Sequence, residues 1–366
     1  MPVPLVIVAG ARPNFMKVAP LLAALSPDTD FAATLVHTGQ HYDYAMSGRF
    51  FEELGLPEPA YHLEAGSGSH AQQTAEILKR IEPVLIETAP RGVIVVGDVN
   101  STLAAALAAK KLGIDVIHVE AGLRSFDRRM PEEINRVATD AICDLFLVSE
   151  ESGCRNLLRE GAAPERVHLV GNTMIDSLRR HLDQAMKGDA RGRVVGTNGR
   201  FGLVTLHRPA NVDDDRQMRG ILEALNKIAE EVPLYWPVHP RTRARLNSGV
   251  DVSPEIHLLE PLGYLDFLNL EAQSTVVLTD SGGMQEETTA LGVPCLTIRE
   301  NTERPATIEQ GTNRLAGTTT ESILQAWRET TAHPKRGMIP PLWDGMAAER
   351  CRTVLREYFL AAPGAP

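Results

Sequence analysis

The sequence predicts an α/β protein built from two Rossmann-like, doubly wound domains with a cleft between them. Short apolar runs rich in Val, Ile and Leu alternate with helix-like stretches along the chain. These runs lack the polar–apolar alternation of a half-exposed sheet, as expected of parallel strands covered on both faces. The alternating series breaks once near the middle of the chain and then begins again. Strand–helix–strand series of this kind form right-handed parallel sheets with helices on both faces.

The first series contains several predicted strands and one especially clear helix. The helix is Asn100–Leu112, which is rich in alanine, the strongest helix former. The predicted strands are Leu5–Ala9, Ala33–His37, Gly92–Val96, Val116–Val119, Leu145–Val148 and Val167–Val170.

A segment of different composition separates the two series. Lys187–Arg200 is rich in Gly, Arg and Asp, and is predicted to be a linker or surface loop. The second series has predicted strands at Gly202–Leu206, Leu234–Val238, Ile256–Leu259, Thr275–Leu278 and Pro294–Ile298. Its predicted helices are Asp214–Glu231, Tyr264–Ala272 and Gln285–Leu291, and a last amphipathic helix is predicted at Ala347–Leu360. We therefore expect a first domain over residues 1–175, a second over 176–345, and a C-terminal helical segment, 346–366, that packs back toward the first domain.

The composition excludes several classes of protein. The 366 residues carry a formal net charge of -10, whereas a non-specific nucleic-acid-binding protein needs a basic face. The N-terminal apolar run Leu5–Ala9 is too short for a signal peptide or a membrane span. We therefore expect a cytoplasmic protein with neither a nucleic-acid nor a membrane partner. The four cysteines show no paired metal-ligand spacing, so no metal site is predicted.

Polar side chains follow the predicted strands of the first series at the points where these strands end. Doubly wound sheets bind ligands beyond those carboxyl ends. The segment after the first strand lacks the GxGxxG pattern of a dinucleotide site, and its basic side chains suit a phosphate or a sugar instead. The candidates of this series are Arg12, Lys17, Asp98, Glu120, Glu132 and Arg136.

Structural roles are alternatives for several residues of this series. Asp98 is suited to capping the helix that follows it. Glu133 and Arg136 lie three residues apart on a predicted helix and are suited to a surface ion pair. His118 lies between valines and is suited to be a hydrogen-bonded histidine of the core.

The segment Thr279–Glu287 is the most informative part of the chain. It joins a predicted strand to a predicted helix, and Ser281, Gly282 and Gly283 let a ligand approach the backbone closely. The unpaired amides of a helix N-terminus attract phosphate, and the carboxylates that follow can accept hydrogen bonds from a ribose. A nucleotide diphosphate satisfies both features. The alternative is an ordinary strand–turn–helix joint with an acidic first helical turn.

Basic and imidazole groups follow other strands of the second series. His207 has the chemistry needed for proton transfer or for charge beside a phosphate. Arg304 is suited either to clamping a diphosphate or to ordering its loop. The candidates are His207, Arg208, His239 and Arg304.

In their order along the chain, these motifs resemble those of the non-hydrolysing UDP-N-acetylglucosamine 2-epimerases. The resemblance runs from about Val6 to Gly317 and covers most of the chain. It rests on Gly10-Ala11-Arg12-Pro13 with Lys17, Gly39-Gln40-His41, Gly97-Asp98 with Ser101-Thr102, His118–Arg124, Pro131–Arg136, Gly171-Asn172-Thr173 with Asp176, His207-Arg208, Asp280–Glu287 and Thr302–Pro305.

The resemblance implies a GT-B-like pair of Rossmann domains, no cofactor, and a homodimer that interconverts UDP-GlcNAc and UDP-ManNAc for polysaccharide biosynthesis. It implies a reaction through 2-acetamidoglucal, formed by loss of UDP from C1 and of the proton from C2. It assigns catalysis to Asp98, Glu120, Glu132 and His207, with His207 at the leaving diphosphate. It assigns UDP-sugar contacts to Arg12, Lys17, Ser281, Gly282, Gly283, Glu287 and Arg304, with Glu287 rather than Glu286 at the ribose. Further candidates for binding, from their positions, are Arg136, Arg208 and His239.

Two departures concern the substrate and its regulation. Tyr42-Asp43-Tyr44 stands where members activated by a second UDP-GlcNAc molecule have Arg-Glu, and Gly66–His70 also differs from those members. The same pattern occurs in relatives that act on other UDP-2-acetamido sugars, so a UDP-2,3-diacetamido uronic acid is an alternative substrate. A GT-B glycosyltransferase and a non-catalytic UDP-sugar sensor are more remote alternatives, because neither needs three acidic motifs.

Overall fold

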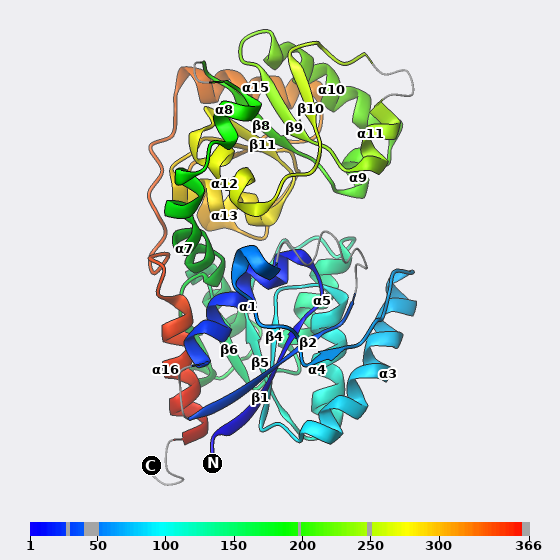
Figure 1. Ribbon diagram of the computed structural model, residues 1–366, viewed down its shortest axis with the longest axis vertical. Helices are drawn as coiled ribbons and strands as arrows, with labels where there is room; N and C mark the ends of the chain where they lie inside the picture. Colours follow the sequence, from blue (N-terminus) through cyan, green and yellow to red (C-terminus); the bar gives the residue numbers. More distant parts are fainter. Residues whose placement is uncertain (27–29, 40–50, 197–198, 247–250, 361–366) are drawn as a thin grey trace. The chain divides into compact units, whose positions relative to one another are not determined.

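The computed structural model describes residues 1–26, 30–39, 51–196, 199–246 and 251–360, but not the side chains of Arg12, Pro240 and Arg241. The chain forms two compact units, one made of Met1–Arg179 with Pro341–Pro366 and the other of Arg180–Pro340 (Figure 1). Within the described chain, no helix combines the length and the apolar character needed to cross a membrane.

The first unit contains a seven-stranded parallel sheet in the described residues. Its strands lie in the order β3-β2-β1-β4-β5-β6-β7. Leu5 and Val6 of β1 are each 1% exposed although they point to opposite faces, so the sheet is covered on both sides. The strands are β1 (Val3–Ala9), β2 (Phe31–His37), β3 (Tyr61–His62), β4 (Gly92–Val96), β5 (Asp115–Val119), β6 (Leu145–Val148) and β7 (Val167–Leu169).

Helices cover both faces of this sheet. α3 and α4 pack on the face that includes Val6, whereas α1 and α16 lie together on the other (Figure 1). The amides of Ala347 and Ala348 at the start of α16 donate to the Asp176 carboxylate at 3.1 and 2.7 Å. The C-terminal helix is therefore part of the first unit. The helices are α1 (Arg12–Leu25), α3 (His70–Thr88), α4 (Asn100–Lys111), α5 (Pro131–Asp140), α6 (Glu151–Arg159), the first part of α7 (Thr173–Lys187) and α16 (Ala347–Leu360).

The second unit contains a six-stranded parallel sheet in the order β10-β9-β8-β11-β12-β13. α10 and α15 pack on one face around Trp236, and α8, α12 and α13 pack on the other around Phe201. The strands are β8 (Gly202–Thr205), β9 (Leu234–Pro237), β10 (Ile256–Leu259), β11 (Val276–Thr279), β12 (Cys295–Thr297) and β13 (Asn313–Leu315). The helices are α8 (Ala190–Val194), α9 (Pro209–Val212), α10 (Asp215–Ala229), α11 (Pro240–Leu246), α12 (Tyr264–Gln273), α13 (Gly282–Leu291), α14 (Pro305–Glu309) and α15 (Thr320–Ala332).

Both sheets have the strand order of a doubly wound fold. In each, the chain adds strands outward on one side of its first strand and then returns to add the remainder on the other side. The predicted fold class, α/β with two Rossmann-like doubly wound units, is confirmed.

The structure corrects the interpretation of Lys187–Arg200 as a linker or loop. Within this segment Ala190–Val194 forms α8, and Ala190 is fully buried against the second unit's core. The helix was not predicted because its apolar face consists of only a few residues between charged ones. Strands β3 and β13 were also not predicted, since two and three residues are too few to show a period.

Candidate active site

The candidate residues of both units follow strands at the carboxyl edge of each sheet. The strand order reverses between β1 and β4 in the first unit and between β8 and β11 in the second. This is the usual ligand position in doubly wound sheets. Most of the predicted residues lie on the loops that leave these four strands or their neighbours.

A buried ion pair joins Lys17 of α1 to Glu120, the residue after β5. Lys17 is 5% and Glu120 6% exposed. Glu120 has a φ of 70°, a left-handed conformation that is uncommon for a residue other than glycine. Its amide donates to the carbonyl of Leu147 at 2.9 Å, which ties the strained residue to β6. Strained backbone of this kind clusters at functional sites.

Gly97, the residue after β4, makes room for this ion pair. It has a φ of 68°, and a Cβ atom there would lie 3.2 Å from Nζ of Lys17 and 3.4 Å from Oε2 of Glu120. A side chain would therefore be strained and would also crowd the ion pair. Asp98 follows Gly97 on the same turn, so two of the predicted carboxylates, Asp98 and Glu120, lie next to this glycine.

Asp98 is paired with Arg136 of α5. The same guanidinium binds Glu133, with Nη2 2.9 Å from Oε2. The two structural alternatives for these residues are wrong. The N-cap of α4 is Val99, so Asp98 does not cap that helix. The Glu133–Arg136 pair is buried rather than on the surface, because Glu133 also accepts backbone amides of the loop before α5.

Glu132 lies in the first turn of α5, next to the residues that hold Asp98. Its side chain is half-buried, and within the described residues its carboxylate has no hydrogen-bond or ion-pair partner. The first unit thus gathers two carboxylates paired with cations, Asp98 and Glu120, near the helix that carries a third.

In the second unit, His207 follows β8 and is oriented by Asp280, which follows β11. The His207 side chain is 62% exposed and Asp280 is fully buried, with Nδ1 2.9 Å from Oδ1. Asp280 also accepts the amides of His207 and Arg208 and the side-chain amide of Asn211. Burial acts to raise the pKa of Asp280, but the hydrogen bond and charge of His207 outweigh it and hold this pKa below its ordinary value. The ring binds through Nδ1, which leaves Nε2 on the side away from Asp280.

Helix α13 begins at Gly282, with Ser281 as its N-cap residue. Glu286 and Glu287 therefore lie in the second turn, and the alternative of an acidic first turn is wrong. The first amides of the helix have no partners within it and suit an anion. Gly282 lies against Arg304, since a Cβ atom at Gly282 would be 2.5 Å from Nη1 of that arginine.

Arg304 lies in a buried network of ion pairs. Its Nε is 2.9 Å from Oε1 of Glu286, and its guanidinium also pairs with Glu303. Glu303 binds Arg299 in turn at 2.7 Å. These four residues are each 5% exposed or less. The contacts order the loop after β12, which is one of the two roles predicted for Arg304.

Glu287 has a different environment from Glu286. It accepts a hydrogen bond from the Tyr264 hydroxyl at 3.1 Å. Burial raises the pKa of Glu287 to about 7; the Tyr264 hydrogen bond opposes this rise and the charge of Glu286 adds to it. Burial, with the charge of Glu287, also raises the pKa of Glu271 well above its usual range.

Other predicted residues are placed only in part. Arg208 donates from Nε to the Asp280 carbonyl at 2.9 Å. His239 follows β9 and is exposed. The side chain of Arg12 and the motif residues Gln40–Tyr44 lie outside the described residues.

A profile of the family described as UDP-N-acetylglucosamine 2-epimerase matches residues 23–356. The chain belongs to this family. A relative from Methanocaldococcus jannaschii named UDP-N-acetylglucosamine 2-epimerase is 43% identical over 359 residues, which cover 95% of this chain and 98% of the relative. A Pseudomonas aeruginosa relative named UDP-2,3-diacetamido-2,3-dideoxy-D-glucuronate 2-epimerase is 41% identical over 324 residues, which cover 88% of this chain and 90% of the relative.

A solved structure of the Methanocaldococcus jannaschii UDP-GlcNAc 2-epimerase, in complex with UDP-GlcNAc and UDP, has the same fold. Its TM-score against this chain is 0.89 at 42% sequence identity, and the match covers 96% of this chain and 99% of that one. The relatives are UDP-sugar 2-epimerases by name, which makes this a family of isomerases.

In this member of the 2-epimerase family, the residues that orient the candidate groups were not predicted in that role from the sequence. Asp280, Asn211 and Glu133 act on their neighbours from buried positions. Asp280 had a signal, because it is a charged residue directly after a buried strand and before the Ser281–Gly283 turn. Asn211 had no comparable signal, since its partners, Asp280 and the Ile298 carbonyl, come from distant parts of the chain. Glu133 was considered only as part of a surface pair with Arg136.

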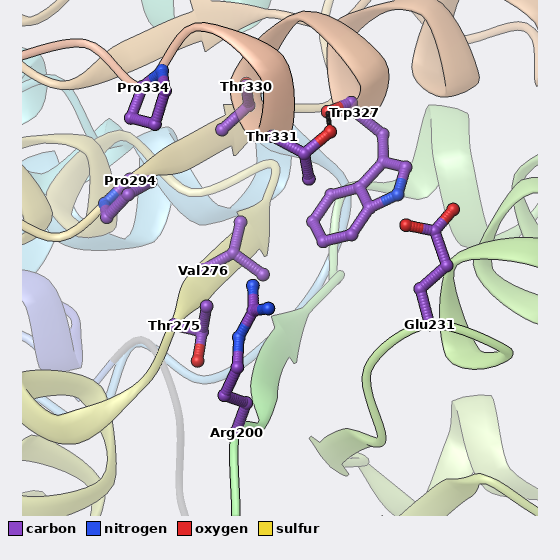
Figure 2. A pocket seen from close by; sticks show the side chains of 9 residues that line it. All are labelled: Arg200, Glu231, Thr275, Val276, Pro294, Trp327, Thr330, Thr331 and Pro334. Carbon is purple, nitrogen blue, oxygen red and sulfur yellow. Dashed lines mark hydrogen bonds between the residues drawn. The ribbon is translucent and has the colours of Figure 1, made fainter.

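A cavity of about 270 Å³ lies at the opposite edge of the second sheet, near the amino ends of β8, β11 and β12. Figure 2 shows the Trp327 indole across its middle, with Arg200 and Glu231 on different sides. Because doubly wound sheets bind ligands at the other edge, this cavity is not the candidate active site of the epimerase fold. It is lined by Arg200, Glu231, Thr275, Val276, Pro294, Trp327, Thr330, Thr331 and Pro334.

Proposed function

We propose that the chain is a non-hydrolysing UDP-N-acetylglucosamine 2-epimerase that interconverts UDP-GlcNAc and UDP-ManNAc. The observation that carries this proposal is the group of acidic residues at the carboxyl edge of the first sheet, two of them paired with cations, in a chain of this family. A transferase or a sensor of UDP-sugars has no need for such a group.

The chemistry explains why carboxylates are needed. C2 of the sugar is not next to a carbonyl, so its proton is barely acidic. Breaking the C1–O bond to UDP gives the ring oxocarbenium character, which makes the C2 proton removable. One carboxylate accepts that proton as the C1=C2 double bond forms, giving 2-acetamidoglucal and UDP. A diphosphate oxygen then adds back to C1 while C2 receives a proton on its other face.

The proposed roles follow from the local geometry. Asp98, Glu120 and Glu132 accept and return the proton at C2, and their negative charge stabilises the developing cation. His207 acts at the leaving diphosphate through Nε2, because Nδ1 is held by Asp280. In the second unit, Ser281–Gly283 bind the diphosphate and Glu287 binds the ribose hydroxyls.

The test is proton NMR of UDP-GlcNAc incubated with the protein in D2O. We expect UDP-ManNAc to form and both sugars to gain deuterium at C2. Product that keeps protium at C2 would rule out the elimination. An isotope label at the oxygen that joins C1 to the diphosphate should also exchange into the non-bridging positions, because the C1–O bond is broken and re-formed.

A second candidate substrate is a UDP-2,3-diacetamido uronic acid, favoured by the 41% identity to the Pseudomonas aeruginosa relative. Parallel assays with both UDP-sugars distinguish the two. A kcat/KM that is at least tenfold higher for the diacetamido uronate would assign that substrate instead, with the same chemistry at C1 and C2.

The resemblance also leads us to propose a cytoplasmic homodimer that supplies UDP-ManNAc for polysaccharide biosynthesis. Light scattering of the purified protein tests the assembly. A monomeric mass at enzyme concentrations that support full activity would contradict it.

A further inference from the structure

His118 is a fully buried histidine whose two ring nitrogens both face hydrogen-bond acceptors. It lies on β5, two residues before Glu120. Nδ1 is 2.6 Å from Oδ1 of Asp140, and Nε2 is 2.8 Å from the carbonyl oxygen of Gly97. A carbonyl oxygen can only accept, so Nε2 carries a proton.

Asp140 is already supplied with donors on its other oxygen. Nη1 of Arg124 lies 2.7 Å from Oδ2, and the amide of Gly122 donates to it at 3.1 Å. Burial acts to raise the pKa of Asp140, but the charges and hydrogen bonds of His118 and Arg124 outweigh it and hold this pKa below its ordinary value. The ring is therefore held at both nitrogens, with Nδ1 against Oδ1 of Asp140 and Nε2 donating to the Gly97 carbonyl.

The bond to Gly97 reaches the turn that carries Asp98. His118 holds the carbonyl before Asp98, and Nδ2 of Asn135 donates at 2.9 Å to the carbonyl of Asp98 itself. The backbone of Asp98 is thus fixed on both sides, and its carboxylate is fixed separately by Arg136. β4 ends at Val96, and the Gly97 amide makes a further bond to β5 by donating to the Val119 carbonyl at 3.1 Å.

We propose that His118, held between Asp140 and the Gly97 carbonyl, is a positioning residue that sets the Gly97–Asp98 peptide and so aims the Asp98 carboxylate at the sugar. This proposal rests on the proposed function, in which Asp98 takes part in proton transfer at C2. His118 itself touches neither the substrate nor the reacting atoms.

Two amide substitutions separate the two hydrogen bonds of the ring. Asn places its Nδ2 near the position of Nδ1 and keeps the bond to Asp140, whereas Gln places its Nε2 near the position of the ring Nε2 and keeps the bond to Gly97. We expect His118→Asn to lower kcat roughly 10²-fold, the cost of misplacing a reacting group by about 1 Å. We expect kcat of His118→Gln to stay within about tenfold of the wild type. KM should change little in both variants, because the proposed diphosphate and ribose contacts, Ser281–Gly283 and Glu287, lie in the second unit.

The matched control is His168→Gln, at a half-buried histidine of β7 whose ring, within the described residues, bonds only to the local carbonyl of Glu165. It should keep wild-type kcat. Equal kcat values for His118→Asn and His118→Gln, or a change confined to KM, would overturn the positioning role. A wild-type protein that epimerises no UDP-2-acetamido sugar would instead overturn the proposed function.

A measurement on the wild type does not depend on activity or on the folding of a variant. In protein labelled with ¹⁵N-histidine, the signals of one buried ring should show a protonated Nε2, and these signals should be absent from His118→Gln. A His118 ring without a proton on Nε2 would overturn the bond to the Gly97 carbonyl, whatever the kinetics show.

Discussion

At the scale of single residues, His207 depends on a carboxylate that solvent does not reach. The Asp280 carboxylate accepts from four groups of residues 207–211, and only one of them, Nδ1, belongs to the His207 ring. The exposed half of the ring carries Nε2. The proposed catalytic group, His207, follows β8, and the residue that orients it, Asp280, follows β11. These two strands are neighbours in the sheet.

Replacing His207 by alanine removes the group proposed to act on the leaving diphosphate. We expect His207→Ala to lower kcat by roughly 10²–10⁴-fold, the usual contribution of one general acid–base group. The affinity for UDP, measured by calorimetry, should change much less. Near-wild-type turnover would show that the histidine has only a structural role.

Replacing Asp280 by asparagine tests whether it acts through His207. We expect Asp280→Asn to lower kcat, and the double variant with His207→Ala to be no slower than His207→Ala alone, because residues that act as one unit are not additive. Asp214→Asn is the control, since asparagine retains the N-cap of α10. Additive losses of kcat in the double variant would show that Asp280 and His207 act independently.

The raised pKa of Glu287 predicts how stability depends on pH. In the unfolded chain this carboxyl has its ordinary pKa of about 4.5, and in the folded protein burial raises its pKa to about 7. Between these values the native state holds the extra proton, so the free energy of unfolding falls as pH rises, by up to about 3 kcal/mol from this group. A lower free energy of unfolding appears as a lower melting temperature. Without ligand, the melting temperature of Glu287→Gln should therefore fall less than that of the wild type between pH 5 and 8. Glu309→Gln, an exposed glutamate on α14, should leave the slope unchanged.

At the scale of elements, the start of α13 is shaped by Gly282. An added Cβ atom would lie 2.5 Å from Nη1 of Arg304 and 2.9 Å from Oε1 of Glu303, both buried. We expect Gly282→Ala to displace this network and weaken UDP binding by at least roughly tenfold, or about 1.4 kcal/mol. Gly220→Ala, in the middle of α10 with ordinary contact distances, should leave UDP affinity unchanged.

That outcome would be contradicted if calorimetry gave Gly282→Ala the same UDP affinity as the wild type. A second check is the melting temperature without ligand. Gly220→Ala should raise it slightly, because alanine is favoured over glycine within a helix by about 1 kcal/mol.

Elements with a continuous apolar run could be predicted from the sequence, whereas those with short runs could not. β4 and β6 have the predicted bounds because every residue in them is buried. α8 was not predicted because its one buried residue, Ala190, lies next to arginines. Candidate residues could be found from their positions after strands. The pairs they form could not, since Lys17 and Glu120 are 103 residues apart and no local pattern joins them.

At the scale of the whole molecule, each unit has its own core. We expect calorimetry to resolve two unfolding transitions, one for each unit. Leu355→Ala in α16 should lower the transition of the first unit and Leu225→Ala in α10 that of the second, each by about 2–5 kcal/mol, because both leucines are fully buried. Either substitution shifting both transitions equally would contradict this independence.

The return of α16 to the first unit has a consequence for synthesis on the ribosome. The second unit is one continuous segment, Arg180–Pro340, but the first unit is interrupted by it. At about 5–20 residues per second, α16 emerges roughly 10–40 s after the rest of the first unit. During that interval the apolar face of α1 and Leu5 lacks its cover, so the nascent chain exposes a surface for chaperones to bind. A frameshift near the 3′ end of the coding sequence would make that exposure permanent, and the product should be cleared by proteolysis although all proposed catalytic residues are present.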